Sequence, residues 1–149
     1  MFAILFAVVA TFFNFLVALL FGSLTTGSTF GFEGIENVGY IFIQTVAYIT
    51  FAMFLAVLFR RSGAAIAVFF LYGLIFEWLI TLLINMKFEL TPVGYFLPLQ
   101  VTDVMLPIPF GDKVIYKDAP DTWIMVIASL VYIAGYYFFA LKKFTKEDL

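Results

Sequence analysis

Long apolar runs alternate with short polar segments along this chain, and the runs have the length of membrane spans. About 20 helical residues, each rising 1.5 Å, cross a hydrocarbon core of roughly 30 Å. The runs that reach this length predict transmembrane helices at residues 1–21, 38–59, 64–84 and 122–141. The pattern therefore predicts an all-α integral membrane protein in which residues 1–149 form a single domain of four transmembrane helices.

The polar segments between these runs predict how the helices are connected. Residues 22–37 are rich in Gly, Ser and Thr, which is typical of a loop at the membrane surface. Residues 60–63 (RRSG) are few enough for a tight turn, so we expect the second and third spans to form an antiparallel helical hairpin. Residues 142–149 (KKFTKEDL) are predicted to be a charged tail.

The longest connection, residues 85–121, is predicted to lie outside the membrane and contains a Pro-rich apolar stretch. Its prolines argue against a continuous crossing helix: Pro92, Pro98, Pro107 and Pro109. We expect an interfacial or re-entrant element of short helices, with Tyr95 and Phe96 near the lipid headgroups. An ordered loop packed on the helix bundle is an equally good interpretation of the same stretch.

Composition supports a membrane protein and excludes several classes of function. Hydrophobic residues make up 64% of the chain and charged residues 12%, against roughly 45–50% and about 25% in soluble domains. Without Cys or His, the chain has no thiol nucleophile and lacks the commonest metal ligand. It has no basic run for nucleic acid and no G-x-x-x-x-G-K phosphate loop. We therefore expect no catalytic residues, no metal, no cofactor and no nucleic-acid partner.

The N-terminal run and the basic residues predict how the protein lies in its membrane. A signal peptide is the competing interpretation of residues 1–21, but a basic start and a small-residue cleavage site are missing there. Basic residues favour the side that holds Arg60, Arg61, Lys142, Lys143 and Lys146 over the side that holds Lys87, Lys113 and Lys117. The positive-inside rule then predicts a multi-pass protein of the inner or plasma membrane, with both termini cytoplasmic.

Polar residues inside the predicted spans are the candidate functional residues. Glu77 lies mid-span, where a charged group costs about 2.5–3.5 kcal/mol, and no basic residue lies within a span to pair with it. It recurs at four-residue spacing with Gly73, Thr81 and Asn85, so this stripe can face another helix. A substrate or proton pathway is one interpretation, but we favour a neutral, hydrogen-bonded Glu77 that anchors two helices.

Asn14 and Gln44 are the other two candidates for an intramembrane polar path or a packing contact. They share helix faces with small residues, which permit close helix approach: Ala3, Ala7, Ala10 and Ala18 in the first span, Ala52 and Ala56 in the second. Each amide can donate and accept across a helix interface, worth about 0.6–2 kcal/mol per bond, and packing is the favoured role. The fourth span is expected to present Tyr132, Tyr136 and Tyr137 to lipid or to the membrane interface.

The order of several motifs resembles the membrane subunits of type-2 ATP-binding-cassette (ABC) exporters. The motifs are the turn and helix FRRSGAAIAVFFLYGLIFEWL, the external GYFLPLQVTDVMLPIPF and the ending ALKKFTKEDL. In that family a basic-Ser-Gly turn precedes a span that can carry an acid, a Leu-Pro element follows outside, and the last helix ends in an aromatic, basic and Asp-Leu tail. The matching positions are residues 60–63, Glu77, Leu97-Pro98 and residues 144–149.

The resemblance covers residues 38–149 well and the first span loosely, and it carries functional expectations. It implies a permease that forms a translocation path as a homodimer or heterodimer and is driven by separate ATPase subunits. The first two spans would line or flank that path, with Asn14, Gln44 and Glu77 as polar contacts near it. Members normally have six spans and a cytosolic loop that docks on the ATPase, so the chain resembles the last four spans of such a subunit.

Two other classes of function fit the same residues. A small four-helix membrane scaffold or assembly factor would bind other membrane proteins through its small-residue faces, without transport. An ion or proton channel would use Glu77 and predicts a conductance that depends on pH.

Overall fold

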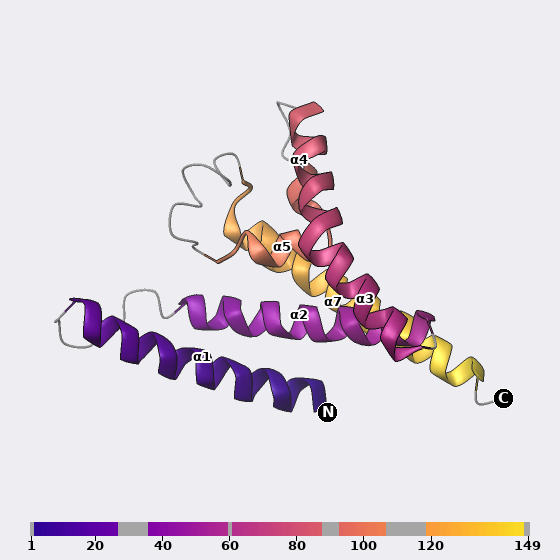
Figure 1. Cartoon of the computed structure of the whole chain (residues 1–149), viewed down its shortest axis with the longest axis horizontal. Helices are drawn as coiled ribbons and strands as arrows, with labels where there is room; N and C mark the ends of the chain where they lie inside the picture. The colour runs from indigo at the N-terminus through magenta and orange to yellow at the C-terminus, as the bar shows by residue number, and fades with distance from the viewer. Residues whose placement is uncertain (1, 27–35, 60, 88–92, 107–118, 148–149) are drawn as a thin grey trace.

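The computed structural model describes residues 2–26, 36–59, 61–87, 93–106 and 119–147, and their regular structure is all helical (Figure 1). The long helices are α1 (Phe2–Thr26), α2 (Glu36–Phe59) and α7 (Thr122–Glu147). Between α2 and α7, a helix runs through α3 (Ser62–Leu71), the π-helical turn η1 (Tyr72–Phe76) and α4 (Glu77–Lys87). Two short elements follow α4, the 3₁₀ turn η2 (Val93–Phe96) and α5 (Gln100–Asp103).

Three of the helical stretches are long and apolar enough to cross a membrane, which makes this a multi-pass membrane protein by helix length and hydropathy. They are Glu36–Phe59, Ser62–Lys87 and Thr122–Lys143, and their most apolar windows have mean hydropathies of 2.1 to 2.2. The N-terminal helix contains a shorter apolar stretch, Ile4–Leu16. The second, third and fourth predicted spans are therefore confirmed as long apolar helices, and the first as an apolar helix.

Several predicted boundaries differ from the observed ones because helices continue into polar sequence. The predicted loop at residues 22–37 is partly helical, since α1 extends to Thr26 and α2 begins at Glu36. The predicted charged tail is wrong in its first six residues, because α7 continues through Glu147. Lys and Glu are good helix formers, and cations are favourable near a helix C-terminus.

The helices pack around α2, which contacts α1, α3 and α7. In Figure 1, α1 runs alongside α2, whereas α4 rises away from it. The predicted hairpin is therefore right for α3, which packs on α2, and wrong for α4, whose principal contacts are with η1, η2 and α5. The helical pair opens because the segment that contains η2 and α5 packs between α4 and the pair α2 and α7.

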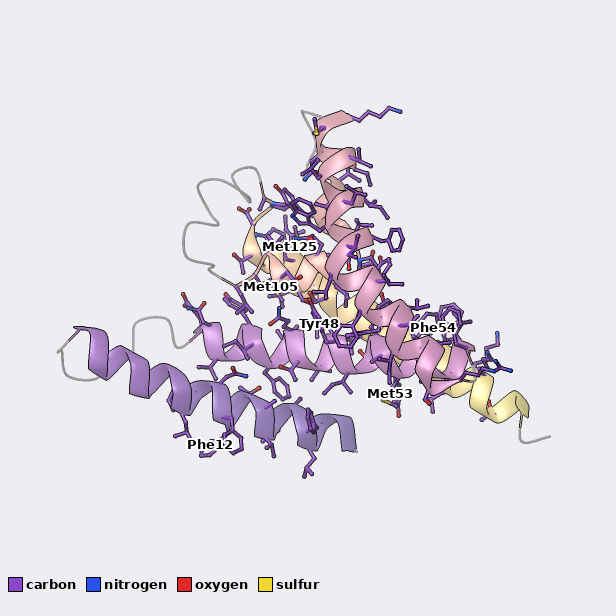
Figure 2. All side chains as sticks on the ribbon, in the orientation of Figure 1. Phe12, Tyr48, Met53, Phe54, Met105 and Met125 are labelled. Carbon is purple, nitrogen blue, oxygen red and sulfur yellow. The ribbon has the colours of Figure 1, made fainter. Side chains whose placement is uncertain are left out.

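Two clusters of buried side chains form the core. The first joins Phe51 and Leu55 of α2 to Ala65 of α3 and to Leu99. The second joins Tyr95, Val101 and Met105 to Met125 of α7, and Figure 2 shows Met105 and Met125 close together. Both clusters thus include residues from the Pro-rich connection, which the sequence analysis placed outside the predicted spans.

The tyrosines of α7 contradict the expectation that they face lipid. The Tyr136 ring lies 5.3 Å from that of Phe51 and 5.4 Å from that of Phe54, and the Tyr132 ring stacks on Tyr136 at 5.9 Å. Only Tyr137 is exposed as expected, at 57%. Aromatic rings gain from pairing with one another as well as from lying at an interface, and α7 uses two of the three tyrosines for pairing.

Candidate functional site

The candidate site is built around residues 93–106, which we call the inserted segment. It consists of η2, a Leu97-Pro98 link, α5 and the turn that follows. Its buried residues are Gly94, Tyr95, Leu99, Gln100, Val101, Thr102 and Met105. The interpretation as an ordered loop packed on the bundle therefore describes this part of the connection. Tyr95 is only 7% exposed, because its ring packs in the second core cluster and is covered by protein.

The side chain of Glu77 binds backbone groups of the inserted segment. Its Oε1 accepts hydrogen bonds from the N–H groups of Leu99, at 2.6 Å, and Gln100, at 2.9 Å. These N–H groups lie at the start of α5, where a helix leaves its first donors without an intrahelical partner. Glu77 is 1% exposed, so it supplies a buried acceptor to donors that water cannot reach. The predicted anchor is therefore hydrogen-bonded, but its partner is a connecting segment rather than another span.

The next two members of the polar stripe also bind the inserted segment. Thr81 Oγ1 donates to the carbonyl oxygen of Gly94 at 3.2 Å, and the N–H of Gly94 donates to Asn85 Oδ1 at 3.0 Å. A Cβ atom on Gly94 would lie 2.7 Å from both Asn85 Oδ1 and the Thr81 carbonyl oxygen, so a side chain has no room there. Gly73 also faces this segment, because a Cβ atom there would lie 3.3 Å from Leu99 Cδ1. The four residues of the stripe thus form one helix face that contacts residues 93–100.

A π-helical turn lies immediately before Glu77. The N–H of Glu77 donates to the carbonyl oxygen of Tyr72, five residues earlier, instead of four as in an α-helix. Such turns are rare, occur mostly singly inside α-helices and are frequent at functional sites. Here the turn separates α3, which packs on α2, from α4, which packs on the inserted segment.

On its other side the inserted segment binds α2 through Asp103. Asp103 Oδ1 accepts hydrogen bonds from Gln44 Nε2 at 2.7 Å and from Tyr48 Oη at 2.8 Å, and Tyr48 Oη lies 3.0 Å from Oδ2. Burial raises the pKa of the Asp103 carboxyl, while the bonds from Tyr48 and Gln44 oppose this rise. Gln44 thus makes the predicted bond across an interface. The sequence analysis treated Asp103 only as an external acid, although the i, i+4 spacing of Gln44 and Tyr48 indicated a polar face that needed a partner.

The remaining predicted site residues do not join this cluster. Asn14 is exposed and donates from Nδ2 to the Ala10 carbonyl oxygen of its own helix at 2.9 Å. Among the described contacts, Asn14 therefore bonds within its own helix rather than across an interface, because an Asn side chain can reach a carbonyl oxygen on the preceding turn. Arg60 lies outside the described residues. Arg61 is exposed and precedes α3, where its carbonyl oxygen accepts from the N–H of Ala65 at 3.0 Å.

An open apolar groove of about 390 Å³ lies between α1 and α2, away from the inserted segment. Its lining residues are Val8, Thr11, Phe12 and Phe15 of α1 and Val38, Gly39 and Phe42 of α2. Gly39 has no atom within 4 Å of where its Cβ would lie, so the groove has room beside it. Grooves of this size and lining suit apolar molecules.

The described polar side chains are arranged to hold structural elements in place rather than to catalyse a reaction. No group of three or more His, Cys, Asp and Glu side chains that would hold a metal ion occurs in the described part of the chain. The buried Glu77 and the partly buried Asp103 each accept hydrogen bonds from two donors at distances of 3.0 Å or less, so their carboxylates orient backbone and neighbouring helices.

Comparison with known proteins assigns a family. The whole chain, residues 1–149, matches the family described as "Protein of unknown function (DUF2705)", and the protein therefore belongs to that family. No curated protein and no solved structure matches the chain.

Proposed function

We propose that this protein is the transmembrane permease subunit of an ATP-driven exporter of the ABC type. The observation that carries the proposal is the contact between two of the features on which the resemblance rests. The acid of the third predicted span, Glu77, accepts hydrogen bonds from Leu99 and Gln100, directly after Leu97-Pro98. The acid and the Leu-Pro element thus form one structural unit, which gives a physical reason for both to occur in one sequence.

The ends of the helices support the orientation that belongs to this proposal. Lys143 Nζ lies 3.3 Å from the carbonyl oxygen of Leu58, so the end of α7 lies beside the end of α2. Arg61, Lys142 and Lys143 therefore gather at one end of the molecule, which we propose is cytoplasmic. The N-terminal half of α7 and the inserted segment then belong to the opposite, external side.

In the proposed exporter, the chain forms a translocation path with a second permease subunit, as a homodimer or heterodimer, and separate ATPase subunits drive the cycle. The apolar groove between α1 and α2 lies on the two helices that the resemblance assigns to the path. Its lining favours an apolar substrate, such as a lipid, over a hydrophilic one. Gln44 and Glu77 then shape the path by holding the inserted segment, and Asn14 lies on the first of the two helices.

Two alternatives make different use of the same residues. A membrane scaffold or assembly factor is favoured by the inward use of polar side chains, because Gln44, Glu77 and Thr81 bond internally and leave apolar outer faces for other membrane proteins. A proton channel centred on Glu77 has less support, since this residue is 1% exposed and its carboxylate is engaged by two backbone N–H groups.

Co-purification from the native membrane separates these functions. We expect the tagged chain, extracted in mild detergent, to retain a subunit with a phosphate-loop nucleotide site, and the reconstituted complex to hydrolyse ATP faster than the ATPase alone.

The alternatives predict other results from the same preparation. Recovery with other membrane proteins and without an ATPase would replace the exporter with the scaffold. A pH-dependent conductance in bilayers, altered by Glu77→Gln, would replace it with the channel.

A further inference from the structure

The α4 helix depends on the inserted segment for its position. Its principal contacts in the described chain are with η1, η2 and α5, while α2 and α7 contact each other and the inserted segment. Figure 1 shows α4 directed away from α2, with α5 in the space between them. The direction of α4 is therefore set by whatever fixes the inserted segment to α2 and α7.

Four hydrogen bonds described between α4 and the inserted segment involve the backbone of that segment. They run from Glu77 to Leu99 and Gln100, and from Thr81 and Asn85 to Gly94. Backbone groups of Gly94 cannot move away from α4 without losing their bonds, and its missing side chain lets the two backbones touch. Residues 77–87 and 93–106 thus behave as one piece, which we call the α4 unit.

Hydrogen bonds and buried apolar contacts join the α4 unit to the rest of the protein, with Leu99 in the first core cluster and Tyr95, Val101 and Met105 in the second. Asp103 accepts hydrogen bonds from Gln44 and Tyr48 of α2, and Tyr132 Oη of α7 donates to the Phe96 carbonyl oxygen at 2.7 Å. The apolar part of this interface includes Met105 against Met125 (Figure 2). Methionine side chains are flexible and adapt to altered packing, so this contact tolerates sliding.

The connection between the α4 unit and α3 is the π-helical turn Tyr72–Phe76. On one side of it, α3 is held to α2 by ring contacts, with Phe69 at 6.0 Å from both Tyr48 and Phe51. On the other side, α4 belongs to the α4 unit. A turn with a wider hydrogen-bonding pattern between two differently anchored helices is a natural place for bending.

We propose that the α4 unit moves as one rigid lever about Tyr72–Phe76, with the Asp103 carboxylate as the latch that holds it to Gln44 and Tyr48 of α2. Opening the latch breaks both bonds from α2 at once, because they end on the same side chain. The bonds between α4 and the inserted segment are unaffected, since none of those described involves the Asp103 carboxylate. This inference concerns motion alone and does not rest on the proposed transport function.

Distances between paired spin labels in the full chain test the lever, in lipid nanodiscs. The sequence has no cysteine, so introduced pairs are labelled without background. Leu83→Cys with Val93→Cys reports within the α4 unit, and Leu83→Cys with Ile127→Cys reports between the unit and α7. All three positions are exposed, at 57%, 48% and 54% respectively. Both pairs are measured in the parent chain, in Asp103→Ala, and in Gln44→Leu combined with Tyr48→Phe, which removes the two donors and keeps the ring of residue 48.

The lever predicts different behaviour for the two pairs. In Asp103→Ala, the 83–127 distances gain a longer component while the 83–93 distances stay unchanged. Thr45→Val, next to the latch residue Gln44, leaves both pairs unchanged. If both pairs broaden in Asp103→Ala, the α4 unit is not rigid and the proposal is wrong. Unchanged 83–127 distances in Asp103→Ala overturn the latch. If Asp103→Ala does not fold, Gln44→Leu combined with Tyr48→Phe decides, because it removes both donors, and unchanged 83–127 distances in that variant overturn the latch.

Discussion

The two halves of the third apolar helix are held by different forces. The α3 half packs on α2 through rings and a small residue, with Ala65 only 5% exposed and Phe69 against Tyr48 and Phe51. The α4 half is held by hydrogen bonds from Glu77, Thr81 and Asn85 to the backbone of the inserted segment. Only a π-helical turn of five residues separates the two halves.

This difference arises because lipid can replace an apolar contact but cannot replace a hydrogen bond. Hydrocarbon tails solvate a Phe ring about as well as a protein core does, so apolar helix contacts in a membrane depend on close fit. Lipid offers nothing to a backbone N–H, which costs several kcal/mol when it is left without a partner there. Hydrogen bonds therefore fix the position of the α4 half, whereas closely fitting apolar side chains fix the position of the α3 half. Substitutions that disturb the two halves should therefore lower the free energy of unfolding by different amounts.

The largest effect is expected from Glu77→Ala. It removes the acceptor of two buried N–H groups, and the loss is expected to be about 3 kcal/mol of unfolding free energy. Reversible unfolding in mixed detergent micelles measures this change. Glu77→Gln keeps one carbonyl acceptor in place and should lose clearly less. Equal losses in the two variants would mean that charge, rather than acceptor geometry, holds the inserted segment.

A smaller effect is expected from Gly94→Ala. The added Cβ meets Asn85 Oδ1 and the Thr81 carbonyl oxygen at 2.7 Å, so α4 and η2 must separate, at about 2 kcal/mol. Gly39→Ala is the matched control, since its Cβ has nothing within 4 Å and Ala favours the helix by up to about 1 kcal/mol. Thermal unfolding of both variants in the same detergent makes the comparison. A Gly94→Ala protein as stable as the control would contradict the close contact.

The smallest effect is expected from Phe51→Leu, on the face of α2 against which the α3 half packs. Its ring contacts Phe69, Tyr72 and Tyr136 at centroid distances of 5.3 to 6.0 Å, and ring pairing is worth about 1 kcal/mol. We expect a loss of that size in the same unfolding assay, because Leu refills much of the volume. A loss larger than that of Glu77→Ala would reverse the comparison between the two halves.

Sequence patterns predicted the polar stripe correctly but could not identify what it contacts. The four-residue spacing of Glu77, Thr81 and Asn85 places them on one face whatever lies opposite. Prolines in residues 92–109 excluded a crossing helix, yet they suited a surface element and a packed one equally. Burial of Leu99 and Val101, at 1% and 0% exposed, decided for packing.

Asn14 and Asp103 illustrate the same limit from opposite sides. An Asn inside an apolar helix indicates a polar contact, but it can find its acceptor one turn back, as Asn14 does on Ala10. Asp103 had no helical pattern around it, and its role depends on Gln44 and Tyr48, which are 59 and 55 residues away along the chain. Neither outcome follows from local sequence.

Length and hydropathy by themselves determined the long apolar helices of this protein, because a helix in lipid satisfies its own backbone bonds and needs only apolar residues over a sufficient length. The same sequence determined which polar residues share a face. Tertiary structure alone decided that Glu77 accepts hydrogen bonds from the backbone of Leu99 and Gln100. It also decided that Asp103 accepts hydrogen bonds from the side chains of Gln44 and Tyr48. A hydrogen bond needs donor and acceptor within about 3 Å, and only the packed chain brings such distant residues that close.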